Sequence, residues 1–391
     1  MPSSERILNR EFCLIWLVNF FIFISFQILI PTIPLFVSKI FHNDAIVGIV
    51  VGVYTFSAVL LRPISGKLME RPEAKAITVL GLLVFGFLSI CYNFSSSLLV
   101  FFLIRIGHGA LWGISTTATS AVAADAIPAM RRVEGMGYFT LSQNIAMAIG
   151  PGLGIYLISR FTFGKLFFCS MTFSVMAALT MLRVKAPKKT DISEGGILNL
   201  LEKAALAPSL ILFCATMIQG AIVPFLPLYA GEKGVISYLG LYFATFATVL
   251  VLTRPFVGRL ANRKGIYIVS LAGLMATVMA LMLLCRLNTL TGLLASAVCW
   301  GLGFGAIHPL MMAAAIQLAP HNKAKATATI WTFFDLGIGI GAILAGYVAK
   351  YWGYEAIYLT FTMFPLSAMV LLISKRELFR PTPITTISNI S

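Results

Sequence analysis

The chain has 391 residues, of which 59% are hydrophobic and only 11% are charged, and its formal net charge is +15. A soluble domain carries about 25% charged residues, because its surface must face water. The composition therefore excludes an ordinary soluble globular protein and indicates a chain whose surroundings are lipid.

Apolar segments long enough to cross a membrane follow one another along the whole chain. A helix needs about 20 apolar residues to cross roughly 30 Å of hydrocarbon. Twelve such segments are expected, at residues 12–38, 45–66, 76–94, 98–124, 135–159, 163–184, 207–230, 236–258, 266–286, 290–318, 327–349 and 354–374. The sequence therefore predicts an all-α integral membrane protein with twelve transmembrane helices.

The basic residues are distributed unevenly between the connections. If the N-terminus lies inside, most of the 29 lysine and arginine residues fall in the even-numbered connections and the two termini. A bias of this kind sets membrane topology, with the positive loops on the cytoplasmic side. We therefore expect both termini in the cytoplasm, and the net charge requires no nucleic-acid partner.

No motif for catalysis, ATP hydrolysis or metal binding is present in the sequence. It has no G-x-x-x-x-G-K-[ST] phosphate loop and no nucleophile–base or metal-ligand constellation. The cysteines lie within predicted spans and form no C-x-x-C pair: Cys13, Cys91, Cys169, Cys214, Cys285 and Cys299. We expect neither an enzyme nor a cofactor or metal site.

The second half of the chain repeats the first at an offset of about 192 residues. RPISGKLMER at 62–71 returns as RPFVGRLANR at 254–263. Six crossings return a chain to its starting side, so the two copies have the same orientation. The repeat predicts two pseudo-symmetric six-helix bundles, residues 1–184 and 207–391, joined by a cytoplasmic linker at 185–206. Such parallel repeats occur in transporters that bind substrate near the midplane, between the halves.

Asp335 is the only carboxylate expected well inside a span, where the first half has Gln143 at the same offset. A charged residue at the centre of a membrane helix costs about 2.5–3.5 kcal/mol on insertion scales, which makes it a functional-site hypothesis. Because burial favours the neutral form of a carboxyl, Asp335 is a candidate for taking up and releasing a proton. A carboxyl neutralised by a structural partner is the alternative.

Arg105 is the only basic residue expected well inside a span, and it must therefore face the protein interior. It either pairs with a structural partner or meets the substrate. His108, on a neighbouring turn, is a candidate proton relay, and His308 is similar; a hydrogen-bonded packing role is the alternative for both histidines.

Other polar and aromatic residues within the spans are candidates for lining a central substrate cavity, because such pockets are mostly apolar with a few placed polar groups. Together with Arg105 and His308 they are Asn19, Gln27, Tyr54, Gln143, Asn144, Gln219 and Trp331.

Two further features indicate how the helices meet. The repeated Arg-Pro-x-x-Gly stretch predicts a tight turn at the cytoplasmic face, with cations that cap helix carbonyls. Its residues are Arg62, Gly66, Glu70 and Arg71 in the first copy and Arg254, Gly258 and Arg263 in the second. The second feature is a G-P-x-x-G motif formed by Gly150, Pro151 and Gly154, which predicts a kinked helix and close packing against a neighbour.

Taken with the twelve spans and the repeat, these motifs resemble the major facilitator superfamily, and within it the twelve-span drug:proton antiporters. The connection after span 2 is similar to the family's G-x-L-a-D-r-x-G-r-k, with Glu70 for the acid, whereas the second copy has Asn262 there. Arg105 with Gly109 is similar to the span-4 motif, and G-P-x-x-G to the antiporter motif of span 5.

The resemblance implies a monomeric transporter in a bacterial plasma membrane that exports small molecules in exchange for protons. It implies that the loops after spans 2 and 8 act as gating latches, for which simple positive-inside anchors are the alternative. It also implies that the antiporter motif packs span 5 against span 8. An importer or facilitator of a small polar or anionic metabolite is the second hypothesis, and a non-transporting membrane sensor is the third.

Overall fold

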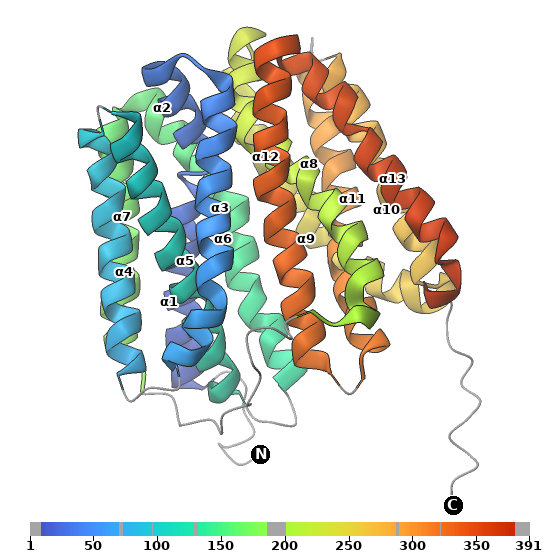
Figure 1. Cartoon of the computed structure of the whole chain (residues 1–391), viewed down its shortest axis with the longest axis horizontal. Helices are drawn as coiled ribbons and strands as arrows, with labels where there is room; N and C mark the ends of the chain where they lie inside the picture. The colour runs from blue at the N-terminus through green and yellow to red at the C-terminus, as the bar shows by residue number, and fades with distance from the viewer. Residues whose placement is uncertain are drawn as a thin grey trace, which may run out of the picture.

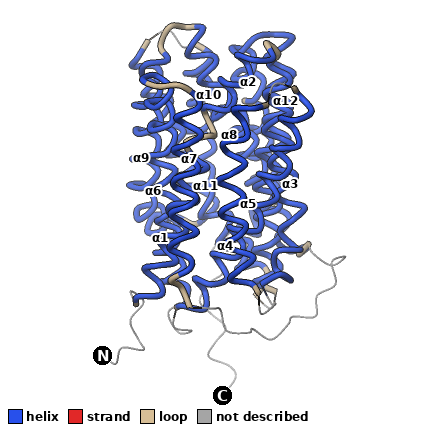
Figure 2. The backbone as a smooth tube through the Cα atoms, turned by 90° about the vertical axis from the view of Figure 1, so that its left-hand side faces the viewer, coloured by secondary structure: helices blue, strands red, loops and turns tan. Residues whose placement is uncertain are grey.

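Long apolar helices run side by side between the two ends of the molecule (Figure 1). The computed structural model describes residues 9–69, 73–95, 97–127, 132–185, 201–286, 289–320 and 322–379. All regular structure in these ranges is helical, as Figure 2 shows. The expected linker therefore lies largely outside the described residues.

The first half contains seven α-helices: α1 (Arg10–Gln27), α2 (Thr32–Phe41), α3 (Asp44–Met69), α4 (Ala74–Cys91), α5 (Leu98–Ala126), α6 (Arg132–Arg160) and α7 (Phe163–Leu182). The second half contains α8 (Leu206–Glu232), α9 (Leu239–Lys264), α10 (Ile266–Cys285), α11 (Leu290–Leu318), α12 (Lys323–Phe361) and α13 (Met363–Ser374). Short 3-10 turns precede α5, α8 and α9 and follow α13. The first span was expected to be one helix; it is broken before Pro31, whose ring nitrogen has no hydrogen to donate.

Eleven helical segments of the described chain are long and apolar enough to cross a membrane. The last of them, Lys325–Ser374, has 50 residues, which is about 75 Å at 1.5 Å per residue and more than twice the thickness of the hydrocarbon. It reverses at Gly353, whose φ of 81° and ψ of 171° suit only glycine. The last segment therefore crosses twice, as α12 and α13 do in Figure 1, and the prediction of twelve transmembrane helices is confirmed.

The two ends of the molecule differ in how the halves are joined. We call the end at which α1 begins and α13 ends the proximal end, and the opposite end distal (Figure 1). At the distal end, one hydrophobic cluster contains residues of both halves, including Ile28 and Val47 with Ile222 and Tyr229. At the proximal end, each half of the described chain has its own cluster. The bundles therefore share a core only in their distal part.

Two helix pairs form this distal seal, and the closer one is α3 against α12. A Cβ atom added at Gly48 would meet the carbonyl oxygen of Ala342, and one added at Gly346 would lie 3.1 Å from the Cα of Gly48. The second pair is α6 against α9, where an added Cβ at Gly152 would lie 3.5 Å from the carbonyl oxygen of Gly240. Small residues let these backbones approach closely, as they do at other membrane helix contacts.

Gly48→Ala is expected to lower the thermal stability of the protein, because its methyl group has no room against the α12 backbone. Overpacking of this kind costs about 1–3 kcal/mol. Gly231→Ala in α8 is the matched control, since the nearest atom to its methyl group lies 3.8 Å away. Thermal unfolding in one detergent should give a lower midpoint for Gly48→Ala only; equal midpoints would contradict the close contact.

Candidate functional site

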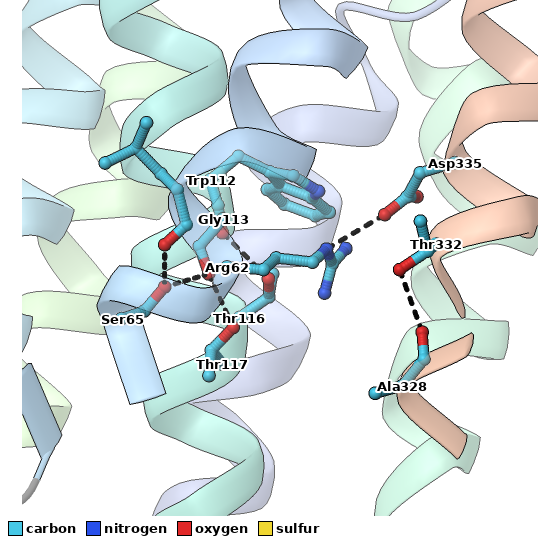
Figure 3. Close-up of polar contacts among 10 residues, drawn as sticks. Arg62, Ser65, Trp112, Gly113, Thr116, Thr117, Ala328, Thr332 and Asp335 are labelled. Carbon is cyan, nitrogen blue, oxygen red and sulfur yellow. Dashed lines mark hydrogen bonds and ion pairs between the residues drawn. The ribbon is translucent and has the colours of Figure 1, made fainter. Parts of the chain in front are cut away.

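An ion pair joins the two halves between α3 and α12. The Nε atom of Arg62 lies 2.9 Å from the Oδ2 atom of Asp335. Their side chains are 27% and 12% exposed, respectively. Figure 3 shows Arg62 reaching from α3 toward Asp335, with Trp112 and Thr116 of α5 beside it. The interior acid that the sequence singles out therefore has a cationic partner in the other half of the molecule.

Close packing on the distal side of the pair sets the distance between the two helices. An added Cβ at Gly339, about one turn distal to Asp335, would lie 3.3 Å from the Cβ of Thr55, about two turns distal to Arg62. On the proximal side, Ser65 donates to the carbonyl oxygen of Leu61 at 2.7 Å and lies 3.4 Å from that of Gly113. These contacts hold α3 against both α5 and α12 at the height of Arg62.

The structure corrects the sequence interpretation of the stretch that contains Arg62. The predicted tight turn is absent from the described residues, since α3 continues through Arg62 and Gly66 to Met69. The second copy is also helical, and α9 ends at Gly265 with a φ of 85°. A membrane helix tolerates an internal proline because neighbouring groups satisfy the freed carbonyl.

The remaining residues of the predicted gating loops have mixed positions. Glu70 and Arg71 lie outside the described residues. Arg263 is exposed in the last turn of α9. Gly258 lies within α9 in open space, because an added Cβ there would meet nothing within 4 Å.

Arg105 is buried in the first half, with 5% of its surface exposed, and its partners are neutral. Its Nε donates to the carbonyl oxygen of Val50 at 3.2 Å, and Nη1 donates to the hydroxyl of Tyr92 at 3.4 Å. The guanidinium carbon lies 4.4 Å from the ring centroid of Tyr54. No carboxylate within the described ranges pairs with Arg105, so its charge is held by a carbonyl, a hydroxyl and an aromatic face.

His108 belongs to the same network and is fully buried. Its Nδ1 lies 2.9 Å from the hydroxyl of Tyr92, and its Nε2 lies 3.4 Å from Ser89 Oγ. Ser89 Oγ is 3.1 Å from Ser170 Oγ, which is 3.0 Å from Ser25 Oγ. Hydrogen bonds thus connect α5 to α4, α7 and α1. Neither Tyr92 nor the serines stand out in the sequence, because hydroxyl groups are common in membrane helices.

His308 lies among aromatic rings in the second half. Its ring centroid is 5.6 Å from that of Phe304, 5.3 Å from Phe334 and 5.7 Å from Trp331. The His308 Nε2 atom and the Nε atom of Arg254 are both buried without a hydrogen-bond partner. Two polar groups near the proximal part of this bundle are therefore unsatisfied.

The predicted cavity residues are not all alike. Asn19 is corrected to a structural residue, because it is fully buried and its amide donates to Ser142 Oγ at 2.7 Å. Tyr54 stacks on Phe26 with ring centroids 5.1 Å apart, and its hydroxyl has no partner. Buried atoms of Asn144 and Gln219 are also without partners. The side chains of Gln27 and Gln143 are buried and half-buried, respectively.

The G-P-x-x-G motif lies in α6 and faces two neighbours. Added Cβ atoms at Gly150 and Gly154 would meet Gln27 and Ile28 of the first span. Only Gly152, between them, faces α9. The expected contact between spans 5 and 8 therefore exists through Gly152, whereas the other two glycines pack within their own bundle.

A polar contact that the sequence did not indicate closes the distal end of the α3–α12 pair. The hydroxyl of Tyr354 donates to Asp44 Oδ1 at 2.9 Å. Asp44 begins α3, and Tyr354 directly follows the turn at Gly353. The α3–α12 contact is therefore bounded by a polar bond at its distal end and by the Arg62–Asp335 pair nearer the proximal end.

Comparison with known proteins is consistent with this architecture. The family model described as Major Facilitator Superfamily matches residues 15–342 and 209–388. The staphylopine export protein of Staphylococcus aureus is 22% identical, over 95% of this chain and 97% of that protein. The quinolone resistance protein NorA of the same species is 20% identical, over 95% of this chain and 98% of that protein.

Solved structures share the fold at lower sequence identity. A bacterial homologue of the human lysosomal transporter Spinster, in an inward-facing and unoccupied conformation, superposes with a TM-score of 0.78. It is 13% identical, and the match covers 98% of this chain and all of that chain. At this identity the likeness concerns the fold alone.

Tyr92→Phe is expected to destabilise the first half, because Arg105 and His108 both lose the hydroxyl that they share. Leaving buried polar groups unsatisfied costs about 1–3 kcal/mol each. Tyr347→Phe is the control, since this tyrosine is 43% exposed. Thermal unfolding should show a lower midpoint for Tyr92→Phe only; a midpoint like that of the control would mean that the network contributes little to stability.

Proposed function

Since the chain belongs to the major facilitator superfamily, whose members are transporters and not enzymes, we propose that it exports small amphipathic molecules or metabolites in exchange for protons. The relatives that span its whole length include a metabolite exporter and a drug-resistance protein. We place the protein in a bacterial plasma membrane as a monomer with both termini in the cytoplasm. The proximal end then faces the cytoplasm.

The Arg62–Asp335 pair is the observation that carries this proposal. It links the two halves and contains the one carboxylate that the sequence places deep in a span. A proton on Asp335 removes the negative charge and with it the ion pair, while Arg62 remains charged. Proton uptake therefore weakens a bond between the bundles, which is the coupling that an antiporter needs.

The distal seal supplies the other half of the mechanism. In the form described here the halves share a core at the distal end and have separate cores at the proximal end. Substrate enters from the proximal side, and its contacts compete with the ion pair. The bundles then rock, the seal between α3 and α12 parts, and the substrate leaves distally. Asp335 takes a proton from that side and releases it into the cytoplasm after the seal has closed again.

His108 is the second candidate for handling the proton. Its hydrogen bonds lie within the first half, and its network includes the buried Arg105. In this proposal Asp335 exchanges the proton and the His108 network fixes the shape of its bundle. The two assignments predict different effects on proton flux. If Asp335 exchanges the proton, Asp335→Asn loses the flux; if His108 does, His108→Gln loses it.

The proposal is tested with purified protein in liposomes that carry a pH gradient and an internal pH indicator. Dyes, antibiotics and metabolite anions are added in turn, and substrate-evoked proton flux is recorded. The proton flux of Asp335→Asn is expected to be at least tenfold lower than that of the wild type, because the asparagine side chain cannot ionise. Glu355→Gln, at an exposed site near the distal end, is the control and should retain the flux.

Other variants identify the proton site and the role of the pair. Arg62→Gln should keep Asp335 able to ionise but should reduce the coupling of proton flux to substrate transport. The reason is that Asp335 then has no cation to pair with in the form whose distal seal is closed. Flux retained in Asp335→Asn and lost in His108→Gln would move the proton site to His108. Metabolite uptake without proton movement would show a facilitator, and an absence of any transport would favour a sensor.

A further inference from the structure

The repeat places an arginine at the same position in both halves, but only one of them has an acidic partner. The offset of 192 residues aligns Arg62 with Arg254 and Asp335 with Gln143. Arg62 pairs with Asp335 at 2.9 Å. In the part of the chain that the structure describes, Arg254 forms no ion pair, and its Nε atom is buried without a partner. The second half therefore holds a cation whose expected carboxylate has become an amide.

At two other positions, an acid of the first half is replaced by an amide in the second. The same offset aligns Glu70 with Asn262 and Asp125 with Gln317. The comparison is one of sequence, since the side chains of Glu70 and Asp125 lie outside the described structure. All three substitutions remove negative charge while keeping a polar side chain. In sequence, the positions that correspond between the repeats are therefore less acidic beside Arg254 than beside Arg62.

One groove between α9 and α11, near the proximal end, is lined by Arg254 and by the two amides Asn262 and Gln317. The groove has a volume of about 190 Å³, and its lining includes Arg254, Asn262 and Gln317 together with Gly258. Asn262 and Gln317 are exposed, and Arg254 is half-buried. A Cβ added at Gly258 would meet nothing within 4 Å, so the space beside Arg254 is open.

The groove combines donors with an uncompensated charge. A guanidinium presents a planar set of N–H donors that matches a carboxylate or phosphate, and each amide adds an NH₂ group. Among the described residues, no aspartate or glutamate lines the groove to repel an anion. A partly desolvated cation without a counter-ion is unfavourable, and a bound anion offsets that cost.

We propose that this groove binds the carboxylate, or another oxyanion group, of the transported molecule as it enters from the proximal side. The inference rests on the proposed export function and gives it a substrate class, namely small molecules that carry at least one acidic group. The charges of Arg62 and Asp335 cancel, so this pair offers no net positive charge to an anion. The anion is therefore bound by Arg254. Arg254 therefore orients the substrate, while Asp335 handles the proton.

Binding is measured by calorimetry on the full-length protein in phosphatidylcholine nanodiscs, at constant ionic strength. Citrate and inorganic phosphate are the anionic probes, and glycerol is the uncharged one. We expect saturable binding of an anionic probe, no binding of glycerol, and at least a tenfold loss of affinity in Arg254→Gln. Arg259→Gln is the matched control, because it removes an exposed cation of α9 that does not line the groove.

A second variant tests the groove without removing the buried arginine. Asn262→Glu combined with Gln317→Asp restores the acids of the first half at two exposed positions, where folding is least affected. This double variant should abolish binding of the anionic probe. The unfolding midpoint of each variant is measured alongside, and unchanged binding in the correctly folded double variant would overturn the proposal.

Three further outcomes would also overturn it. The first is a wild-type protein that binds neither citrate nor phosphate. The second is an Arg259→Gln variant that binds the anionic probe as weakly as Arg254→Gln does, which would show general attraction of anions to a basic surface. The third is competition by phosphatidylglycerol added to the nanodiscs, which would identify the site as one for a lipid headgroup.

The proton-flux assay separates failure of this inference from failure of the export proposal. Flux evoked by neutral or cationic compounds, without anion binding to the groove, would leave proton antiport in place and refute the acidic substrate class. Anion binding that depends on Arg254, without proton flux for any compound, would refute antiport and with it the role of the groove in export. Anion binding together with citrate-evoked flux that falls in Arg254→Gln would support both.

Discussion

A charge inside a lipid-embedded protein is costly unless a partner offsets it, and this constraint explains how Arg62, Asp335 and Arg105 are placed. Arg62 and Asp335 satisfy each other across the interface between the bundles. Arg105 is satisfied within one bundle by a carbonyl, a hydroxyl and a ring. The first arrangement depends on how the bundles lie and the second does not. A charge pair at the interface can therefore report and control conformation, whereas a single charge held by neutral groups inside one bundle stabilises a rigid body.

Much of the fold was predictable, because the membrane restricts a chain to long apolar helices. The twelve spans and the repeat follow from hydropathy and offset, and the cost of a buried carboxylate singles out Asp335 as a candidate. Helix ends were harder, since α3 and α9 continue through Arg-Pro-x-x-Gly, and only Gly265 ends α9. Proline and glycine break helices in water more reliably than in a packed membrane bundle.

The geometry of the site could not be predicted from the sequence, because it depends on contacts between distant spans. Arg62 was expected at a cytoplasmic turn. It lies within α3 instead, and the packing of α3 against α12 brings it to Asp335, which is 273 residues away in the chain. Asn19 was expected in a cavity but binds Ser142 inside a bundle. A polar residue within a span is expected to face the protein interior and not the lipid. Whether it lines a cavity or lies in a packed core depends on how the helix is rotated about its axis, which hydropathy does not determine.

The glycines that line α3 and α12 have a consequence for the motion itself. Closing an interface built from long side chains restricts their rotamers, at about 0.5–2 kcal/mol for each residue. Gly48 and Gly346 have no rotamers to lose and face backbone atoms, so the two backbones meet there without that entropic cost, whereas Gly52 and Gly339 receive the side chains of Ile343 and Thr55. At Gly48 and Gly346, little side-chain interlocking has to be undone when the contact parts. The α3–α12 contact can therefore part at these glycines at little entropic cost, between the Tyr354 bond at its distal end and the Arg62–Asp335 pair nearer the proximal end.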